Sequence, residues 1–358
     1  MTNINLADYG LNPRFRQEAE LYEGMYLARV CSQHRELYKL VGECGEFAAV
    51  VSGRLAHNAS NSTEFPAVGD WVMVDRANDY AGNAVILHVL QRKSMFARKS
   101  AGTSHSLQIV AANIDVIFIC MSLNADFSLR RLERYLSIAW DSMAIPVIVL
   151  TKADLCNDLK ARLADIATVS GGTNVVVCSG MTESGCQAIL SHITPGKTIA
   201  FIGSSGVGKS TLINRLLGQT VLSTREIRED DKGRHTTTHR QLLLLPGGGI
   251  VIDTPGMREL QLDSVNLAKA FADIEDLAAN CKYRDCSHAT EPGCAVRNAI
   301  NTGELPEERL ESYKKLLKEA CYAGLNSRQL EQEKIKNMFG GLGEMKQVMR
   351  YAKNKKKR

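Results

Sequence analysis

The stretch Gly203-Ser204-Ser205-Gly206-Val207-Gly208-Lys209-Ser210 decides the fold of this chain. It follows the apolar run 198–202 and precedes the segment 211–217, so we expect a strand, a glycine-rich loop and a helix. The loop's backbone N–H groups can cradle phosphate oxygens, and the start of the helix adds favourable positive potential. In such a loop Lys209 reaches the β- and γ-phosphates, and the hydroxyl of Ser210 ligates Mg²⁺. The alternative is an ordinary glycine turn before a helix, but here every fixed position of the motif is filled.

Length and composition limit the number of domains and the class of protein. The chain has 358 residues, 44% of them hydrophobic, which is enough for two or three domains with a sizeable core. No apolar stretch is long enough to span a bilayer, and residues 1–10 lack the regions of a signal peptide. We therefore expect a cytoplasmic protein with no membrane partner. Ten cysteines are present, and three of them cluster between positions 281 and 294, which favours a reducing compartment with one metal site over disulfides.

The positive charge is concentrated at the C-terminus. The net charge is +5, yet residues 331–358 alone hold nine basic and three acidic residues. The segment 329–358 is therefore predicted as a basic helix, over 329–350, followed by a basic tail. Such a terminal charge run is usually only solvated, but together with the possible oligonucleotide-binding barrel described below, contact with RNA phosphates is the favoured interpretation.

The N-terminal third is predicted to be β-rich. Residues 1–21 are expected to form an irregular extension. Between residues 24 and 90, short β-prone runs alternate with turn residues, which predicts an OB-fold barrel over 22–95. The runs are Met25–Val30, Leu37–Val41, Phe47–Leu55, Trp71–Val74 and Ala84–Leu90. An OB barrel often binds oligonucleotides, although a barrel without a ligand is equally consistent with this pattern. A polar, basic linker is expected over 96–107.

From residue 108 to 263 the pattern alternates between strands and helices. It predicts a doubly wound α/β domain whose parallel sheet carries ligand-binding loops at the carboxyl ends of its strands. The expected strands are 114–121, 147–150, 174–177, 198–202, 241–245 and 250–252. The expected helices are 129–143, 158–169 and 184–193, besides the one that follows the phosphate loop.

A second nucleotide signal follows one of these strands. Thr151-Lys152-Ala153-Asp154 matches the N/T-K-x-D element by which GTPases select guanine. The Asp154 carboxylate can accept hydrogen bonds from N1–H and the 2-amino group of guanine, and the stem of Lys152 can cover the base. Ser179 and Gly180 follow the next strand, where GTPases place a further contact to the base. GTP and GDP are thus the expected ligands.

Two more segments match the switch elements of GTPases. Residues 223–239 contain Thr236, Thr237 and Thr238, and we favour Thr237 as the threonine that closes over Mg²⁺ and the γ-phosphate. The strand 250–252 is followed by Asp253-Thr254-Pro255-Gly256, in which Asp253 lies near Mg²⁺ and the N–H of Gly256 meets the γ-phosphate.

The order of these elements is unusual. The guanine element precedes the phosphate loop, which indicates a circular permutation that opens the sheet near Ile114. Met257 occupies the place of the water-positioning glutamine of Ras-like proteins, so we expect slow hydrolysis unless another group helps. His235 is one candidate for a catalytic role, and a switch contact without a chemical role is the alternative.

A metal-ligand pattern lies downstream. Cys281, Cys286, His288 and Cys294 supply three thiolates and one imidazole within fourteen residues, a closed set typical of structural zinc. Reduced cysteines in a turn are the alternative. Helices are predicted on either side, over 266–279 and 307–320, so a small α-helical zinc-binding domain is expected over 264–328, stabilised largely by its metal.

The combination resembles the RsgA (YjeQ) family of circularly permuted GTPases, over about residues 22–325. The resemblance is carried by Pro66–Val72 in the barrel, by the nucleotide motifs, by Gly233–Thr238 and by the four zinc ligands. It implies an OB-fold, GTP hydrolysis stimulated by the 30S ribosomal subunit, contact with 16S rRNA and a role in late maturation of that subunit. It also implies that Thr151, Lys152, Asp154 and the run 203–211, Thr211 included, bind GTP. Thr151 departs from the more usual asparagine, which is expected to weaken guanine selection without abolishing it.

We therefore expect a monomeric GTPase whose barrel and zinc domain contact rRNA on either side. Because Asp253–Gly256 leads into the zinc domain, the nucleotide state is expected to change that domain's contact with the subunit. Two alternatives stay open. One is a GTPase or ATPase whose barrel binds another oligonucleotide, and the other is a nucleotide sensor that scarcely turns over.

Overall fold

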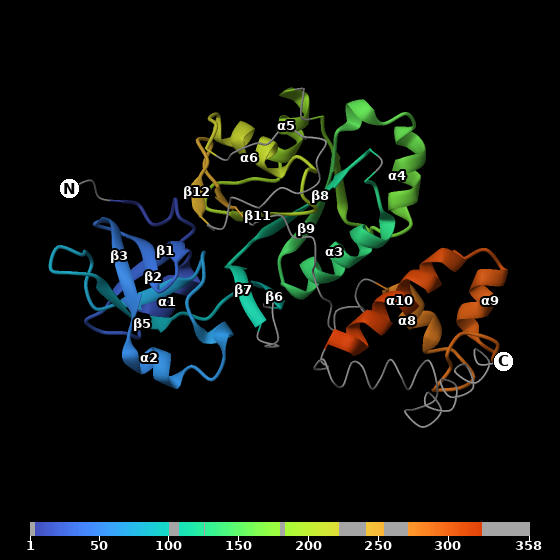
Figure 1. Ribbon diagram of the computed structural model, residues 1–358, viewed down its shortest axis with the longest axis horizontal. Helices are drawn as coiled ribbons and strands as arrows, with labels where there is room; N and C mark the ends of the chain where they lie inside the picture. The colour runs from blue at the N-terminus through green and yellow to red at the C-terminus, as the bar shows by residue number, and fades with distance from the viewer. Residues whose placement is uncertain are drawn as a thin grey trace, which may run out of the picture. The chain divides into compact units, whose positions relative to one another are not determined.

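The computed structural model describes residues 4–99, 107–124, 126–179, 183–221, 241–253 and 271–323. The chain divides into two compact units, one over 1–98 and 106–260 and the other over 99–105 and 261–358. The first unit contains a barrel and a large sheet, and the second is helical (Figure 1). Within the described ranges, no helix combines the length and the apolar character needed to cross a bilayer.

The predicted N-terminal barrel is confirmed. Five strands close in the order β1-β2-β3-β5-β4. Their bounds are β1 Tyr26–His34, β2 Leu37–Gly42, β3 Gly45–Val51, β4 Trp71–Val74 and β5 Ala84–Val89. Alternate residues such as Leu40, Val72 and Ile86 point inward and are fully buried, as a closed barrel requires. Only the β3–β5 pair is parallel among the barrel's pairings.

Local capping explains two differences from the sequence-based expectation. The third strand ends at Val51 instead of Leu55, because the Ser52 hydroxyl accepts from the N–H of Leu55 (3.1 Å) and begins helix α2, Gly53–Asn58. The extension before residue 22 was expected to be irregular, but it contains helix α1, Pro13–Ala19, capped by Asn12. This helix buries Phe15 against Trp71, with ring centroids 5.9 Å apart. A third short helical turn, Ser62–Glu64, precedes β4.

The predicted α/β domain is also confirmed, with a six-stranded sheet in the order β10-β9-β8-β11-β13-β12. The strands are β8 Val116–Ser122, β9 Ile145–Thr151, β10 Asn174–Val177, β11 Thr198–Ile202, β12 Leu242–Leu244 and β13 Ile250–Ile252. All neighbouring pairs are parallel except β12–β13, which is antiparallel. The chain enters this sheet in its middle, at β8, and reaches the phosphate-loop strand β11 only after β9 and β10. This is the permuted order that the motifs predict.

Helices cover both faces of this sheet. Helix α3, Leu129–Asp141, packs on β8 and β9, and α5, Glu183–Leu190, contacts α6, Lys209–Leu217 (Figure 1). In the figure α3 lies on the opposite side of the strands from α5 and α6. Helix α4, Leu159–Ala167, lies between β9 and β10 in the chain. Phe118 and Phe201 belong to the core beneath α6, with ring centroids 5.1 Å apart.

Two short strands lie at the two ends of the predicted basic linker, whose residues 100–106 are outside the described part of the chain. Strands β6, Met95–Lys99, and β7, Leu107–Ala112, pair as a separate two-stranded sheet between the barrel and the large sheet in sequence. The run Leu107–Ala112 is apolar at its end, and Val110, Ala111 and Ala112 are fully buried. Strand β7 therefore belongs to the packed structure of the first unit.

Buried polar contacts join the barrel to the sheet. Arg29 of β1 is 1% exposed, and its guanidinium donates to the Thr198 hydroxyl at 2.8 Å and to the carbonyls of Gly69 and Tyr9. Farther along β1, Ser32 forms an antiparallel bridge with Gln241, next to the edge strand β12. The barrel is thus attached to strand β11 and to the residue that precedes β12 in the six-stranded sheet.

The second unit consists of three described helices. They are α8 Ala272–Ala278, α9 Ala295–Asn301 and α10 Glu307–Ala323. Arg309 of α10, 8% exposed, donates to both carboxylate oxygens of Asp273 (2.5 and 2.8 Å) and lies 4.8 Å above the Phe271 ring. The predicted flanking helices are thus present, α8 within the predicted 266–279 and α10 over the predicted 307–320. The helix expected over 329–350 lies outside the described residues.

Candidate functional site

The phosphate loop has the conformation that its glycines predict. It connects β11 to α6, and Gly203, Gly206 and Gly208 all have positive φ angles, of 146°, 79° and 100°. At Gly203 an added Cβ would lie 2.4 Å from the Cys120 carbonyl oxygen, so a side chain cannot be accommodated. Residues 203–208 therefore form the turn that the motif requires.

Lys209 folds back into the loop. Its ammonium group donates to the carbonyls of Gly203 (2.7 Å) and Ser204 (2.6 Å). Burial lowers the pKa of Lys209, although nearby Cys120 and Asp253 act in the opposite direction. Burial likewise raises the pKa of Asp253, which follows β13, and the charge of Lys209 opposes this. A cation and a carboxylate thus lie near each other beside the loop that is predicted to bind phosphate.

The guanine element lies at the same edge of the sheet. Residues 151–154 follow β9, and Ser179 follows β10. The Ser179 hydroxyl donates to the Asp154 carboxylate at 2.5 Å, and the N–H of Ala153 donates to the Cys178 carbonyl at 3.3 Å. Lys152 has a left-handed backbone, with φ of 57°, which turns the chain sharply after the strand. The two loops predicted to contact the base are therefore side by side.

Thr151 links this element to the phosphate loop. Its side chain is buried, and its hydroxyl lies 2.6 Å from the Val207 carbonyl oxygen and 3.4 Å from that of Met121. A hydroxyl has one proton to donate, and the shorter contact is the better hydrogen bond. The residue that departs from the usual asparagine thus connects the two halves of the predicted nucleotide site.

Several predicted site residues lie outside the described part of the chain. They are Gly180, His235, Thr236, Thr237, Thr238, Gly256 and Met257. Their assigned roles remain predictions. Ser205, Ser210 and Thr211 are described, in the loop and in the first turn of α6.

Two residues near the phosphate loop were missed by the sequence analysis. Arg131 and Tyr135 of α3 both reach the Ser204 hydroxyl, at 3.0 and 3.4 Å. They lie four residues apart, which places them on one face of the helix. That spacing was visible in the sequence, but the sequence alone does not tell which loop this face meets.

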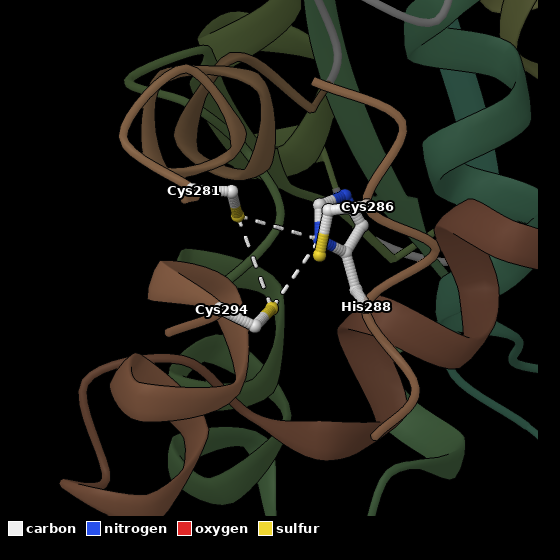
Figure 2. Close-up of side chains that lie close together, drawn as sticks. All are labelled: Cys281, Cys286, His288 and Cys294. Atoms are coloured by element: carbon white, nitrogen blue, oxygen red, sulfur yellow. Dashed lines mark hydrogen bonds between the residues drawn. The ribbon is translucent and has the colours of Figure 1, made fainter. Parts of the chain in front are cut away.

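The predicted metal ligands do come together in the second unit (Figure 2). The ligand atoms of Cys281, Cys286, His288 and Cys294 all lie within 4.8 Å of one another. Cys294 Sγ is 3.5 Å from His288 Nδ1 and 3.9 Å from Cys281 Sγ. Tetrahedral zinc with Zn–S bonds of about 2.3 Å separates its ligands by roughly 3.5–4 Å. This set can hold a metal ion.

The surroundings favour the ligand forms of Cys281 and His288, whereas burial raises the pKa of the Cys286 thiol to about 11. Burial tends to raise the pKa of Cys281, but the N–H groups of Val296 and Ala295 outweigh it, and its pKa is lowered. Burial, followed by the charge of Lys314, lowers the pKa of His288, which keeps the imidazole neutral. Thiolate and neutral imidazole are the forms that bind zinc.

The loop between Cys286 and Cys294 is held by contacts outside the ligand set. Glu291 accepts from the N–H and hydroxyl of Ser287 (2.8 and 2.5 Å) and from the N–H groups of Ala289 and Thr290 (2.9 and 3.1 Å). The Lys314 ammonium donates to the His288 carbonyl at 2.9 Å. Such partners orient the ligands of a metal site.

Comparison with known proteins agrees with this geometry. The RsgA GTPase family model matches residues 89–263. The chain is 54% identical over 346 residues to the small ribosomal subunit biogenesis GTPase RsgA 2 of Lactiplantibacillus plantarum, covering 96% of this chain and 97% of that one. It is 44% identical over 339 residues to the RsgA of Methanosarcina acetivorans, covering 91% and 90%.

Solved structures show the same fold. The crystal structure of YjeQ from Thermotoga maritima matches with a TM-score of 0.62 at 26% identity, over 83% of this chain and 99% of that one. The circularly permuted GTPase YloQ matches with a TM-score of 0.60 at 24% identity, over 84% and 96%.

The permuted sheet and its phosphate loop define a circularly permuted P-loop GTPase, an enzyme that hydrolyses GTP. Beyond this class, the identity over nearly the whole chain is decisive: the chain belongs to the RsgA family, the GTPases of ribosome biogenesis. The resemblance inferred from the motifs is confirmed.

Proposed function

We propose that this GTPase binds the 30S ribosomal subunit and 16S rRNA and acts in late maturation of that subunit, with its GTP hydrolysis stimulated by the subunit. The observation that carries the nucleotide half is the meeting of Asp154, Ser179 and the phosphate loop at one edge of one sheet. The relatives named small ribosomal subunit biogenesis GTPases support the choice of subunit. The place of action is then the cytoplasm, and the working form is a monomer.

In this proposal each nucleotide-site residue has one task. Asp154 selects guanine, Lys152 covers the base, and Ser179 with Gly180 borders it. Residues 203–211 cradle the phosphates, with Lys209 on the β- and γ-phosphates. Ser210 and Thr237 ligate Mg²⁺. Asp253 lies near the metal ion, and the N–H of Gly256 meets the γ-phosphate. His235 is the proposed source of help with the attacking water.

The remaining parts are proposed to contact rRNA. Tyr26 and Tyr80 of the barrel are 50% and 78% exposed, and exposed rings of this kind can stack on unpaired bases. Cys281, Cys286, His288 and Cys294 are proposed to bind structural Zn²⁺, because two or three thiolates with an imidazole form a set that zinc prefers. The basic tail adds attraction to phosphates.

The nucleotide state is proposed to reach the zinc domain through the segment that follows Asp253. A second connection, from Asp253 to the barrel, is supported by backbone contacts. The N–H of Asp253 donates to the Gln241 carbonyl at 3.0 Å, and Gln241 bridges Ser32 of the barrel. Equal 30S affinity with GDP and with a non-hydrolysable GTP analogue would contradict this coupling.

The deciding experiment is GTP hydrolysis by the purified protein alone, with 30S and with 50S subunits, and with ATP as the control nucleotide. Stimulation by 30S only, with GTP only, is expected. Equal turnover of ATP, or no response to either subunit, would remove the ribosomal subunit as the activator and favour another oligonucleotide. Replacing His235 with alanine tests its role, since unchanged turnover would contradict it.

A further inference from the structure

One helix outside the recognised motifs contacts the phosphate loop directly. Arg131 in the first turn of α3 places its Nη1 atom 3.0 Å from the Ser204 hydroxyl oxygen, and the Tyr135 hydroxyl lies 3.4 Å from the same atom. Ser204 is 9% exposed and Tyr135 is 2% exposed. The second residue of the loop is therefore held by its side chain from the α3 side.

The same residue is also held through its backbone. The Lys209 ammonium donates to the carbonyls of Ser204 and Gly203, so two of its three N–H donors are occupied by the loop itself. Bound nucleotide must share this amine, because in P-loop enzymes it contacts the β- and γ-phosphates. Phosphate would compete with these two carbonyls for the amine of Lys209, whereas the contact from α3 does not involve Lys209.

We propose that Arg131 is a positioning residue of the phosphate loop: it fixes Ser204 through the hydroxyl and maintains the phosphate-binding turn while Lys209 engages the nucleotide. This inference rests on the proposed nucleotide site. It assigns Arg131 no contact with the base, which lies on the side of Asp154 and Ser179.

The other contacts of Arg131 explain why the side chain stays in place. The same Nη1 atom lies 3.0 Å from the Asp126 carboxylate and 3.3 Å from the Asp126 carbonyl, just before the helix. Arg131 and Asp126 are 32% and 45% exposed, so the ion pair itself contributes little to stability. Its consequence is orientation: it directs the guanidinium toward the loop.

A double-mutant cycle on the full chain tests the proposal. We expect R131M and S204A each to weaken GDP binding about tenfold. The double variant R131M/S204A should bind GDP no more weakly than either single variant, because both substitutions remove the same contact between Arg131 and Ser204. Binding of GMP, which has no β-phosphate, should change less than about twofold. The ratio of GDP to IDP affinity should also be unchanged, because it depends on recognition of the 2-amino group by Asp154.

R131K, which keeps a cationic donor, should recover most of the affinity. R162M is the matched control, because Arg162 pairs with Asp165 and lies over Phe127. Additive losses in the cycle, or wild-type GDP affinity in R131M, would overturn the proposal. An equal loss for GMP and GDP would also overturn it, as would R131K binding no better than R131M. If R131M fails to fold, S204A and R131K still test the proposal: GDP affinity should fall about tenfold in S204A and stay near the wild-type value in R131K. Failure of the wild-type chain to bind GDP would instead refute the proposed nucleotide site.

Discussion

The Thr151 hydroxyl lies 2.6 Å from the carbonyl oxygen of Val207, which joins the end of strand β9 to the phosphate loop. Thr151 is 3% exposed, so this contact is shielded from water. The element proposed to select the base and the loop proposed to bind the phosphates are thereby held in one arrangement. The departure from asparagine at this position has kept a hydrogen-bond donor.

Replacing Thr151 with valine should weaken both stability and GDP binding. The substitution keeps the shape of the side chain but removes the hydroxyl, so the Val207 carbonyl loses the hydrogen bond from residue 151. We expect the free energy of unfolding to fall by about 1–3 kcal/mol and GDP affinity to fall about tenfold. Urea unfolding and GDP titration measure these effects. T151S retains the hydroxyl and is the matched control; a T151V protein that behaves like T151S would show that the contact contributes nothing.

The sequence predicted those features that depend on local chemistry. The glycines at 203, 206 and 208 specify a turn by their backbone freedom, and the cysteine spacing specifies a metal-ligand set. The permuted strand order followed from the order of the motifs. Arg131, by contrast, could not be assigned, because its role depends on which loop the face of α3 meets. The role of Arg29 could not be predicted either, because it depends on the contact of β1 with Thr198 of β11 in the folded chain.

Glu291 should strengthen zinc binding without touching the metal. It accepts four hydrogen bonds from Ser287, Ala289 and Thr290. The bond from the Ser287 hydroxyl is the main cause that holds the pKa of Glu291 well below its ordinary value. In E291Q one oxygen becomes an NH₂ group that faces N–H donors. We expect zinc affinity to fall about tenfold in competition with a chelator. E308Q changes an exposed glutamate of α10 and should not differ from wild type. Equal zinc affinity in E291Q and E308Q would contradict this assignment.

Asp115 should contribute stability that depends on pH. It accepts from Lys93 (2.7 Å), Lys197 (3.1 Å) and the N–H of Thr198 (2.8 Å). Burial alone raises the pKa of Asp115, but these partners outweigh it and the pKa falls below the ordinary 3.8. A lowered pKa means that, in acid, the folded chain binds fewer protons than the unfolded chain. The stabilisation is therefore complete above the unfolded-state pKa of about 3.8 and is lost as the pH falls through the lower pKa of the folded state.

The measurement is urea unfolding of wild type and D115N between about pH 3 and 7. We expect wild type to be more stable near neutral pH, by about 1–3 kcal/mol, and the difference to shrink as the pH falls below about 4. Comparing the two proteins at each pH removes the effect of the other carboxylates. A difference that stays constant down to the acidic end of this range would show that Asp115 acts by packing and not by charge.

The contact between Arg29 and Thr198 should make the barrel and the large sheet unfold together. Arg29 is almost fully buried, its guanidinium lies 5.4 Å from the Trp71 ring, and it donates to residues on both sides of the junction. In R29M the packing volume is largely kept, but the Thr198 hydroxyl loses the guanidinium and the Gly69 carbonyl keeps only the Asn113 amide as a side-chain donor, at 3.1 Å. We expect the free energy of unfolding to fall by more than about 2 kcal/mol, because buried acceptors on both sides of the junction between barrel and sheet lose the charged donor that they share.

Tryptophan fluorescence can distinguish uncoupling from general destabilisation. The chain has two tryptophans, Trp71 in the barrel and Trp140 in α3. We expect the W140F protein, whose remaining tryptophan is Trp71 in the barrel, to give the same urea midpoint by fluorescence as by far-UV circular dichroism, because the barrel and the sheet belong to one compact unit. Adding R29M should separate the midpoints, with the barrel probe unfolding first. R76M, at an exposed ion pair with Asp75, should leave them coincident. Coincident midpoints in R29M would mean that other contacts across the junction are sufficient to couple the barrel to the sheet.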